Sequence, residues 1–295
     1  MLGGVEIAFV GLGQMGVPMA VNLMKAGFAV TGFDLSERAV GTFVEAGGKG
    51  AASVADAIRD CDCIITMLPN GKIVQQALLT DDAYRQAPAG TLLLEMSSSA
   101  PEETRALAGR VAGHLRVVDA PVSGGVKRAV DGSLAVMAGG SDADYGDAVP
   151  VLEAVSAKRF HCGPVGAGHA MKAINNYVSG AGVIAAVEAV LLGRAFGLDQ
   201  GKVVEVLNAS SGRNNATEVK MNQFILSGTF ASGFALGLMA KDIRTAANLS
   251  ASLGLDQPGL RQTAQLWDDA AGELGRAVDH TRFYDFFARQ VASRG

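Results

Sequence analysis

The feature that most constrains the fold of this chain is a change of pattern near residue 165. Before that point, short apolar runs with the character of strands alternate with longer segments whose apolar residues recur at helical spacing. Alternation of this kind predicts a parallel sheet with helices on both faces. Strands are predicted over residues 5–10, 28–34, 61–68, 91–96, 115–119, 133–139 and 158–161, and helices over 17–27, 36–46, 53–59, 71–79, 101–113 and 141–157.

Beyond Gly168 no strand-like run is found. One Ala-rich helix is predicted from His169 to Phe196, and the remaining segments also have helical periodicity. These further helices are expected at about 200–209, 215–226, 236–253, 258–273 and 281–292. We therefore predict an α/β protein, with a doubly wound domain over residues 1–165 joined by the long inter-domain helix to an all-helical substrate and oligomerisation domain over 166–295. Small ligands usually bind in a cleft between two such domains.

Length and composition agree with two domains and exclude several classes of function. The chain has 295 residues, 49% of them hydrophobic, and a formal net charge of −4, so it offers no basic surface for a nucleic-acid backbone. Its three cysteines are too few and wrongly spaced for a disulfide framework or a structural zinc site, and no metal is expected. The N-terminus runs straight into an apolar strand, and Glu188 interrupts the apolar stretch 173–192. We therefore expect no signal peptide, no membrane span and a cytoplasmic location.

Three glycines in the turn after the first predicted strand point to a dinucleotide. Gly11, Gly13 and Gly16 follow a strand and open a helix, which is the context that the phosphate-binding fingerprint requires. Gly11 allows the tight turn, Gly13 lets the backbone approach a diphosphate, and Gly16 lets the helix pack on the strand. The diphosphate would lie at the positive end of the helix dipole. We predict a Rossmann-type domain in which Gln14 and Met15 also contact the cofactor; the alternative is a tight turn in an unliganded sheet.

The second predicted strand ends in Asp34, which bears on the choice of cofactor. A carboxylate at this position binds both hydroxyls of a ribose and repels a 2′-phosphate, which favours NAD over NADP. Arg38, one turn further on, would soften that preference. NAD is therefore the expected cofactor, with NADP as the alternative.

Lys172, in the early turns of the long helix, is the candidate catalytic residue. Lys172 and Asn176 are four residues apart and share one helix face, whereas Asn175 is angled away. On spacing alone, a Lys172 side chain that only reaches for solvent is an equally good interpretation. The catalytic interpretation has a mechanism, because hydride transfer makes or removes an alkoxide-like charge and needs a proton donor or acceptor beside the substrate oxygen.

Burial and the positive end of the helix would both lower the pKa of Lys172 toward the range of a useful base. Asn176 would orient the ammonium group or the substrate hydroxyl. His169 is the rival acid/base, although a histidine at a helix start is more often a surface group.

Polar loops follow several predicted strands at the edge of the sheet where ligands bind in doubly wound folds. Ser123, Gly124 and Gly125 offer a hydroxyl and unhindered N–H groups that suit a substrate carboxylate, although an ordinary Gly-rich turn would look the same. Loops 67–70 and 97–99 are expected to contact the cofactor. In the helical half, the adjacent Lys241 and Asp242 form either a solvated surface pair or a positioned pair.

Four motifs in this order resemble those of the β-hydroxyacid dehydrogenase family. They are FVGLGQMGVPMA, DAPVSGG, GAGHAMKAINN and LMAKD, and the resemblance spans residues 5 to about 250. It implies a Rossmann-type domain, a long inter-domain helix and a helical second domain, assembled as a homodimer or homotetramer. It also implies an NAD-dependent oxidation of a small β-hydroxy acid to its semialdehyde or keto acid.

The resemblance also assigns residues by position. Lys172 matches the catalytic lysine and Asn176 its companion, and the loop Ser123, Gly124, Gly125 matches the site of the substrate carboxylate. The remaining matches are Lys241 near the nicotinamide, Asp242 as its structural neighbour, and Leu68, Pro69 and Ser98 as cofactor contacts. The sequence departs from the family at Ser98, where Thr is common, and at Glu95-Met96, where Asp-Ser or Asp-Cys is more usual.

Within the family, the motifs SSGRNNATE and GFALGLMAKD are closest to members that oxidise 3-hydroxyisobutyrate. Arg213, Asn214 and Asn215 are expected to reach the variable end of the substrate, with Arg213 as a substrate-binding residue. Two alternatives stay open. One is an NADPH-linked reductase of a short semialdehyde, of the tartronate semialdehyde, succinic semialdehyde or sulfolactaldehyde type. The other is a non-catalytic sensor that binds a dinucleotide.

Overall fold

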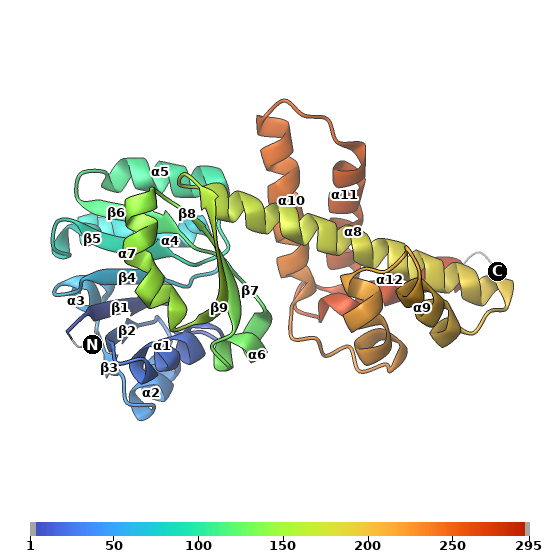
Figure 1. The fold of residues 1–295 in the computed structure, drawn as a ribbon, viewed down its shortest axis with the longest axis horizontal. Coiled ribbons are helices and arrows are strands. Elements are labelled where there is room, and N and C mark those ends of the chain that lie inside the picture. Colours follow the sequence, from blue (N-terminus) through green and yellow to red (C-terminus); the bar gives the residue numbers. More distant parts are fainter. Residues whose placement is uncertain (1–3, 293–295) are drawn as a thin grey trace. The chain divides into compact units, whose positions relative to one another are not determined.

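The chain divides into two compact units, Met1–Lys172 and Ala173–Gly295, in a computed structural model that describes residues 4–292 (Figure 1). The sequence placed the domain boundary near residue 165. The division falls a little later, inside the long helix α8 (Ala167–Phe196). Each unit has its own buried apolar core.

The first unit is built on a sheet in which the described strands run in the order β3-β2-β1-β4-β5-β6-β8-β7, with β9 paired to β8. The order from β3 to β6 is that of a doubly wound dinucleotide-binding sheet. The strands are β1 (Glu6–Val10), β2 (Ala29–Phe33), β3 (Lys49–Gly50), β4 (Cys63–Thr66), β5 (Thr91–Glu95), β6 (Leu115–Asp119), β7 (Val122–Ser123), β8 (Leu134–Gly139) and β9 (Ser156–Gly163). The helices are α1 (Gly16–Lys25), α2 (Glu37–Glu45), α3 (Val54–Ile58), α4 (Gly71–Leu79), η1 (Thr80–Gln86), α5 (Pro101–Val111), α6 (Gly125–Val130) and α7 (Asp142–Glu153).

Helices cover both faces of this sheet because successive strand residues point to opposite sides. Ile7 and Phe9 of β1 face a core completed by α1, α2, α6 and α7. Ala8 and Val10 face a second core completed by α3, α4 and α5. Both faces are therefore dry, which explains why the strands read as nearly continuous apolar runs. The predicted doubly wound α/β fold is confirmed.

The register of the parallel strands sets where ligand-binding loops emerge. The last residues of five neighbouring strands lie side by side: Phe33, Val10, Thr66, Glu95 and Asp119. The loops that follow them therefore leave the sheet at one edge. The glycine turn, Asp34, loops 67–70 and 97–99 and the motif DAPVSGG all lie on or just after these loops.

The sheet is mixed, whereas the sequence predicted a parallel one. Strand β8 runs antiparallel to β6 and β7. The reason is the short helix α6, the only helix between β7 and β8. A parallel crossover needs about a dozen residues or more, usually including a full helix, so the chain returns antiparallel instead. The two-residue strands β3 and β7 were not predicted, since so short a run is indistinguishable from a turn.

The second unit is helical throughout its described residues, as predicted. After α8 come α9 (Gln200–Ala209), η2 (Ala216–Leu226), α10 (Leu236–Ser252), α11 (Pro258–Leu274), η3 (His280–Arg282) and α12 (Phe283–Ala292). Trp267 and Phe283 are fully buried and stack with their ring centroids 4.3 Å apart, at the centre of this core. Aromatic pairs of this kind bury large apolar areas and fix the packing of α11 on α12.

One helix of the second unit has an unexpected winding. The segment η2 was predicted as an ordinary helix over 215–226, but it is a π-helix over its whole length. π-helical segments are rare and occur frequently at functional sites. The side chain of Asn214 accepts hydrogen bonds from the N–H groups of Ala216 (2.8 Å) and Thr217 (3.2 Å) and so closes its first turn.

Helix α8 is long and apolar enough, by length and composition, to cross a membrane; no other helix among the described residues is. Its side chains serve a different purpose, because Val183, Val187 and Val190 are fully buried in the core of the second unit. The prediction that this stretch forms core is consistent with that burial. Figure 1 shows α8 as one continuous helix.

The different roles assigned to Gly16 and Gly13 in the glycine turn can be tested by replacing each with alanine. A Cβ on Gly16 would lie 1.9 Å from the carbonyl oxygen of Gly11, whereas a Cβ on Gly13 would meet nothing within 4 Å. We expect Gly16→Ala to destabilise the protein by at least ~2 kcal/mol, because strand and helix must move apart. Gly13→Ala should change stability by less than ~1 kcal/mol. Urea unfolding without cofactor measures both, and equal stability of the two variants would contradict the assignment.

Candidate functional site

The glycine turn joins β1 to α1 in a tightly constrained conformation. Gly11 has φ +104°, and its N–H donates to the carbonyl oxygen of Phe33 at 2.9 Å. A Cβ on Gly11 would lie 2.4 Å from the carbonyl oxygen of Met67. No other residue type fits this position. Gly13 and Gln14 are exposed and Met15 is half-buried, so the turn is accessible to a ligand.

Asp34 is fixed at the end of β2 by backbone groups. Its carboxylate accepts hydrogen bonds from the N–H of Leu12 (2.7 Å) and of Ser36 (2.8 Å). These two bonds tie the glycine turn to the start of α2. The carboxylate is half-buried and keeps acceptor capacity for a further donor, which is what a ribose hydroxyl would require.

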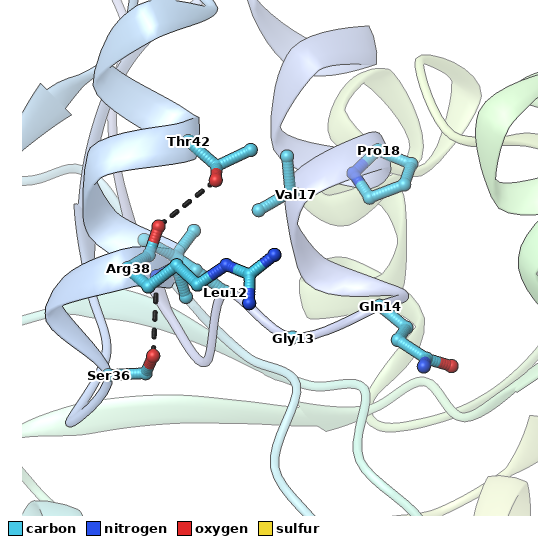
Figure 2. Close-up of a pocket in the computed structure, with 9 residues that line it drawn as sticks. Leu12, Gly13, Gln14, Val17, Pro18, Ser36, Arg38 and Thr42 are labelled. Atoms are coloured by element: carbon cyan, nitrogen blue, oxygen red, sulfur yellow. Dashed lines mark hydrogen bonds between the residues drawn. The ribbon is translucent and has the colours of Figure 1, made fainter.

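A pocket of about 330 Å³ lies between this turn and α2. Figure 2 shows Gln14 and Pro18 on one side and Ser36, Arg38 and Thr42 on the other, with the Arg38 side chain extending into the pocket. The exposed guanidinium is the single cationic group among the lining residues. The pocket therefore presents backbone and hydroxyl groups together with one positive charge.

The two loops after β4 and β5 are linked to each other by Ser97. Its hydroxyl accepts from the N–H of Leu68 (2.9 Å) and donates to the carbonyl oxygen of Thr66 (3.2 Å). Leu68 and Ser98 are half-buried and Pro69 is exposed. The residues predicted to contact the cofactor thus lie at the common edge of the sheet.

His169 is fully buried, whereas the sequence favoured a surface group at this helix start. Its Nε2 lies 3.1 Å from a carboxylate oxygen of Glu95, and its Nδ1 lies 3.4 Å from a carboxylate oxygen of Asp119. Asp119 also accepts from the backbone N–H groups of Gly166 (2.6 Å) and His169 (2.8 Å). The ring, enclosed by protein, is therefore a structural clamp between β5, β6 and α8 rather than a rival acid/base.

The charge state of His169 follows from its neighbours. Burial by itself lowers the pKa of the imidazole, but the charges of Glu95 and Asp119 and the hydrogen bonds to the ring outweigh it, so the net pKa is raised. In the protonated form both ring nitrogens donate, and each has a carboxylate within reach.

Lys172 lies one turn beyond His169 and is held beside the Ser123 loop. Its Nζ donates to the carbonyl oxygen of Val122 at 2.8 Å, and the side chain is half-buried. The loop turns sharply, with φ +137° at Gly124 and +67° at Gly125. The structure thus brings together the predicted catalytic lysine and the predicted carboxylate loop.

In the second unit, Asn176 is oriented by a buried carboxylate. Its amide nitrogen donates to Asp242 at 2.7 Å, and its amide oxygen accepts from the side chain of Asn175 at 3.1 Å. The Nζ of Lys241 lies 3.6 Å from the same Asp242. The adjacent Lys241 and Asp242 therefore lie within ion-pair distance of each other, and their role in the site stays a prediction.

Arg213 stands apart from these groups. Arg213 precedes η2, its side chain is 63% exposed, and its guanidinium lies 3.5 Å from the carboxylate of Glu218 within η2. Asn214 is used to close the first turn of that helix, and Asn215 is exposed. The role of Arg213 in selecting the substrate stays a prediction.

Comparison with known proteins places both halves of the chain in one family. Residues 6–163 match the NAD-binding domain of 6-phosphogluconate dehydrogenase, and residues 166–287 match the NAD-binding domain of NADP-dependent 3-hydroxyisobutyrate dehydrogenase. The chain is 38% identical over 276 residues to 2-(hydroxymethyl)glutarate dehydrogenase of Eubacterium barkeri, covering 92% of this chain and 91% of that one. It is 42% identical over 259 residues to the NAD-dependent L-serine dehydrogenase of Pseudomonas aeruginosa, covering 84% and 87%.

The structural comparison agrees. A structure of 3-hydroxyisobutyrate dehydrogenase from Mycobacterium tuberculosis with L-serine matches with a TM-score of 0.90 and 32% identity, over 96% of this chain and 99% of that one. The chain belongs to the β-hydroxyacid dehydrogenase family. It is an oxidoreductase with an NAD-binding domain, and the reaction of this family is the NAD-dependent oxidation of a β-hydroxy acid.

This β-hydroxyacid dehydrogenase departs from the family motif at Glu95, and the structure gives the departure a use. The Glu95 carboxylate also accepts from the N–H of Ser97 (3.0 Å) and the hydroxyl of Thr104 (3.3 Å). The longer side chain thus reaches His169 while it shapes the loop of Ser97 and Ser98.

Sequence reasoning missed one further residue of this dehydrogenase, Lys220 on η2. It is buried, and its Nζ donates to the hydroxyl of Ser179 on α8 at 3.2 Å. A signal was present, because Ala216, Lys220 and Met221 fall on the same buried face of the segment. A lysine on an apolar helix face is the feature to look for.

The His169 clamp predicts how stability depends on pH. Because the folded-state pKa is raised above the ordinary value of 6.5, the charged clamp contributes fully below about pH 6.5, and this contribution is lost as the pH rises through the folded-state pKa. We expect His169→Gln to cost ~3 kcal/mol at low pH and less at high pH. Urea unfolding of both proteins at about pH 6 and 9 tests this. A difference that stays constant or grows with pH would show that the charge does not stabilise the fold.

Proposed function

We propose that this protein transfers a hydride from a small β-hydroxy acid to NAD, with Lys172 as the acid/base. The observation that carries the proposal is the position of Lys172. Its Nζ donates a hydrogen bond to the carbonyl oxygen of Val122, directly ahead of a loop with a hydroxyl and two glycines. A substrate carboxylate on Ser123, Gly124 and Gly125 would therefore lie close to a proton donor and acceptor.

In this proposal the neutral amine of Lys172 would accept the proton of the substrate hydroxyl, and the hydride from the same carbon would go to the bound cofactor. When NAD is bound it supplies the hydride acceptor; the protein supplies binding, orientation and proton transfer. Asn176 holds the hydroxyl in position, and Asp242 fixes the amide of Asn176 so that the side chain does not rotate. We assign Lys241 a role beside the nicotinamide.

Cofactor recognition is proposed for the glycine turn and the loops after β4 and β5. The diphosphate would lie on the turn of Gly11, Gly13, Gln14, Met15 and Gly16, at the start of α1. Asp34 would bind the ribose hydroxyls, which supports NAD. Leu68, Pro69 and Ser98 would contact the nicotinamide half.

One observation favours a second candidate, an NADPH-linked reductase of a short semialdehyde. The Arg38 guanidinium extends into the pocket beside the turn, where it would accommodate a 2′-phosphate (Figure 2). The chemistry is the same reaction run backwards, so the cofactor that supports faster turnover separates the two.

The relatives suggest which substrates to try. The names of similar proteins include 2-(hydroxymethyl)glutarate, L-serine and 3-hydroxyisobutyrate dehydrogenases. All three substrates carry a primary alcohol on the carbon next to the one that bears the carboxylate. We infer that this grouping is the part of the substrate that Lys172 and the Ser123 loop recognise.

We further propose a homodimer or homotetramer in the cytoplasm. On α8, Leu192 and Phe196 are 72% and 81% exposed, and with Leu198 they line an apolar hollow of about 390 Å³. Exposed apolar surface of this extent supports association with another protein surface.

Initial rates with NAD and with NADP, on a panel of these three acids, glycerate, threonate and 4-hydroxybutyrate, test the proposal. We expect turnover with NAD on at least one acid. Lys172→Ala should lower kcat by ~10²–10⁴-fold, the usual contribution of a positioned acid/base, while the affinity for NADH stays near that of the wild type. The exposed Lys202→Ala is the control. Turnover by Lys172→Ala within tenfold of the wild type would refute the role of this lysine.

The proposed diphosphate site has its own test in Gly13→Ala, the variant expected to keep its fold. A methyl group at this exposed turn would obstruct the approach of the diphosphate, so we expect the Kd for NADH to rise at least tenfold. NADH fluorescence titration measures this. An unchanged Kd would mean that the dinucleotide lies elsewhere.

A further inference from the structure

Lys220 is a buried ammonium group whose charge the described protein does not neutralise. The residue is 9% exposed, and its Nζ has one hydrogen-bond partner among the described residues, the hydroxyl of Ser179. Within that same part of the chain, no carboxylate oxygen lies within 4.0 Å of it. A buried charge is costly unless it is paired.

The acidic group that attracts Lys220 through space is already engaged. Asp279 attracts Lys220 through space, but its carboxylate accepts from the hydroxyls of Ser232 (2.9 Å) and Thr281 (2.6 Å) and from the N–H of Gly233 (2.8 Å). Those bonds hold the segment before α10 against η3. Burial therefore prevails at Lys220 and lowers its pKa to about 8.

The position of Ser179, the hydrogen-bond partner of Lys220, indicates a role for the Lys220 ammonium group. Ser179 lies three residues after Asn176 on α8 and seven after Lys172, so all three side chains share one face of the helix. The rise of an α-helix places Ser179 ~4.5 Å beyond Asn176 along the axis. Lys220 thus adds a positive charge one turn beyond the residue proposed to hold the reacting hydroxyl.

We propose that Lys220 and Ser179 form a subsite for a second carboxylate of the substrate, so that the protein acts on β-hydroxy dicarboxylic acids. The inference rests on the proposed function, in which Asn176 holds the substrate hydroxyl. An ammonium group and a hydroxyl both donate hydrogen bonds, which is what a carboxylate accepts. A bound carboxylate would also supply the counter-charge that the described protein lacks.

Matched substrates test the subsite. 2-(Hydroxymethyl)butyrate and 2-(hydroxymethyl)succinate differ only in that a terminal methyl group is replaced by a carboxylate. We expect the wild type to have the higher kcat/KM on the dicarboxylate. In Lys220→Met, the ratio of the two kcat/KM values should fall at least tenfold, mainly through KM. Lys202→Met, at an exposed lysine that pairs with Glu205, is the control. A ratio that Lys220→Met leaves unchanged, or a wild type that prefers the monocarboxylate, would overturn the subsite.

The melting temperature of Lys220→Met distinguishes a role of Lys220 in substrate binding from a role in stabilising the fold. Methionine matches the length of lysine without its charge, so Lys220→Met should melt at the same temperature as the wild type or higher. A loss on both substrates together with a lower melting temperature would show that Lys220 only supports the fold.

Binding tests the subsite even without turnover. Calorimetry with NADH present compares 2-methylsuccinate with 2-methylbutyrate, neither of which can be oxidised at a hydroxyl. We expect the dicarboxylate to bind more tightly to the wild type, and the advantage to vanish in Lys220→Met. If no acid is oxidised, the proposed function fails while this result still supports the subsite; equal binding of the two acids overturns the subsite alone.

The pH dependence of that binding gives an independent readout. The titratable groups that face Lys220 are Asp279, with a lowered pKa, and His280, whose burial and whose neighbour Lys220 lower its pKa to about 4. Neither changes charge near neutrality. The dicarboxylate's advantage should therefore decrease as the pH rises through about 8, where Lys220 loses its proton. An advantage that persists undiminished well above that pH would contradict the role of the ammonium group.

Discussion

The arrangement of the first unit depends on one buried imidazole. His169 stands between the carboxylates of Glu95 and Asp119, at the ends of two neighbouring strands, and it belongs to the first turn of α8. The same clamp supports the two regions to which we assign binding. Through Glu95 it shapes the loop of Ser97, whose hydroxyl holds Leu68, and along α8 it fixes the direction in which Lys172 leaves the helix. Removing one partner of such a buried group leaves the others without compensation, which makes the clamp costly to change.

The two buried histidines of the chain show how neighbours decide the charge of one residue type. His169 has two carboxylates within ion-pair distance, and its pKa is raised despite complete burial. His280 has burial and the Lys220 ammonium group acting against its charge, and a single carboxylate in its favour, so its pKa is lowered. The charged His169 ring can therefore hold β5, β6 and α8 together through its two carboxylate partners. The His280 ring contributes as a neutral group inside an aromatic core, stacked near Trp267.

Much of this architecture could be read from the sequence because its signals are local. The glycine turn, the strand-helix alternation and the spacing of Lys172 and Asn176 each occupy a few neighbouring residues. Lys172 and the Ser123 loop both lie in motifs of the family, and the structure joins them through the hydrogen bond from Lys172 to Val122. The antiparallel return of β8, the burial of His169 and the isolation of Lys220 depend instead on groups distant along the chain. A histidine at a helix start gives no local sign that two carboxylates converge on it.

The winding of η2 has an evolutionary consequence. A π-helix closes each hydrogen bond one residue later than an α-helix, so its winding is set by every residue of the segment, and deletion of a single codon early in it would move each later residue back by one position. Each later side chain would then turn about the axis by about the rotation of one residue, ~100° in an α-helix. The residue that faces Ser179 would be exchanged for its neighbour without any change to the sheet, the glycine turn or the His169 clamp. A lineage with this fold therefore has a route to new substrates through a three-nucleotide insertion or deletion, far from the residues that carry the common chemistry.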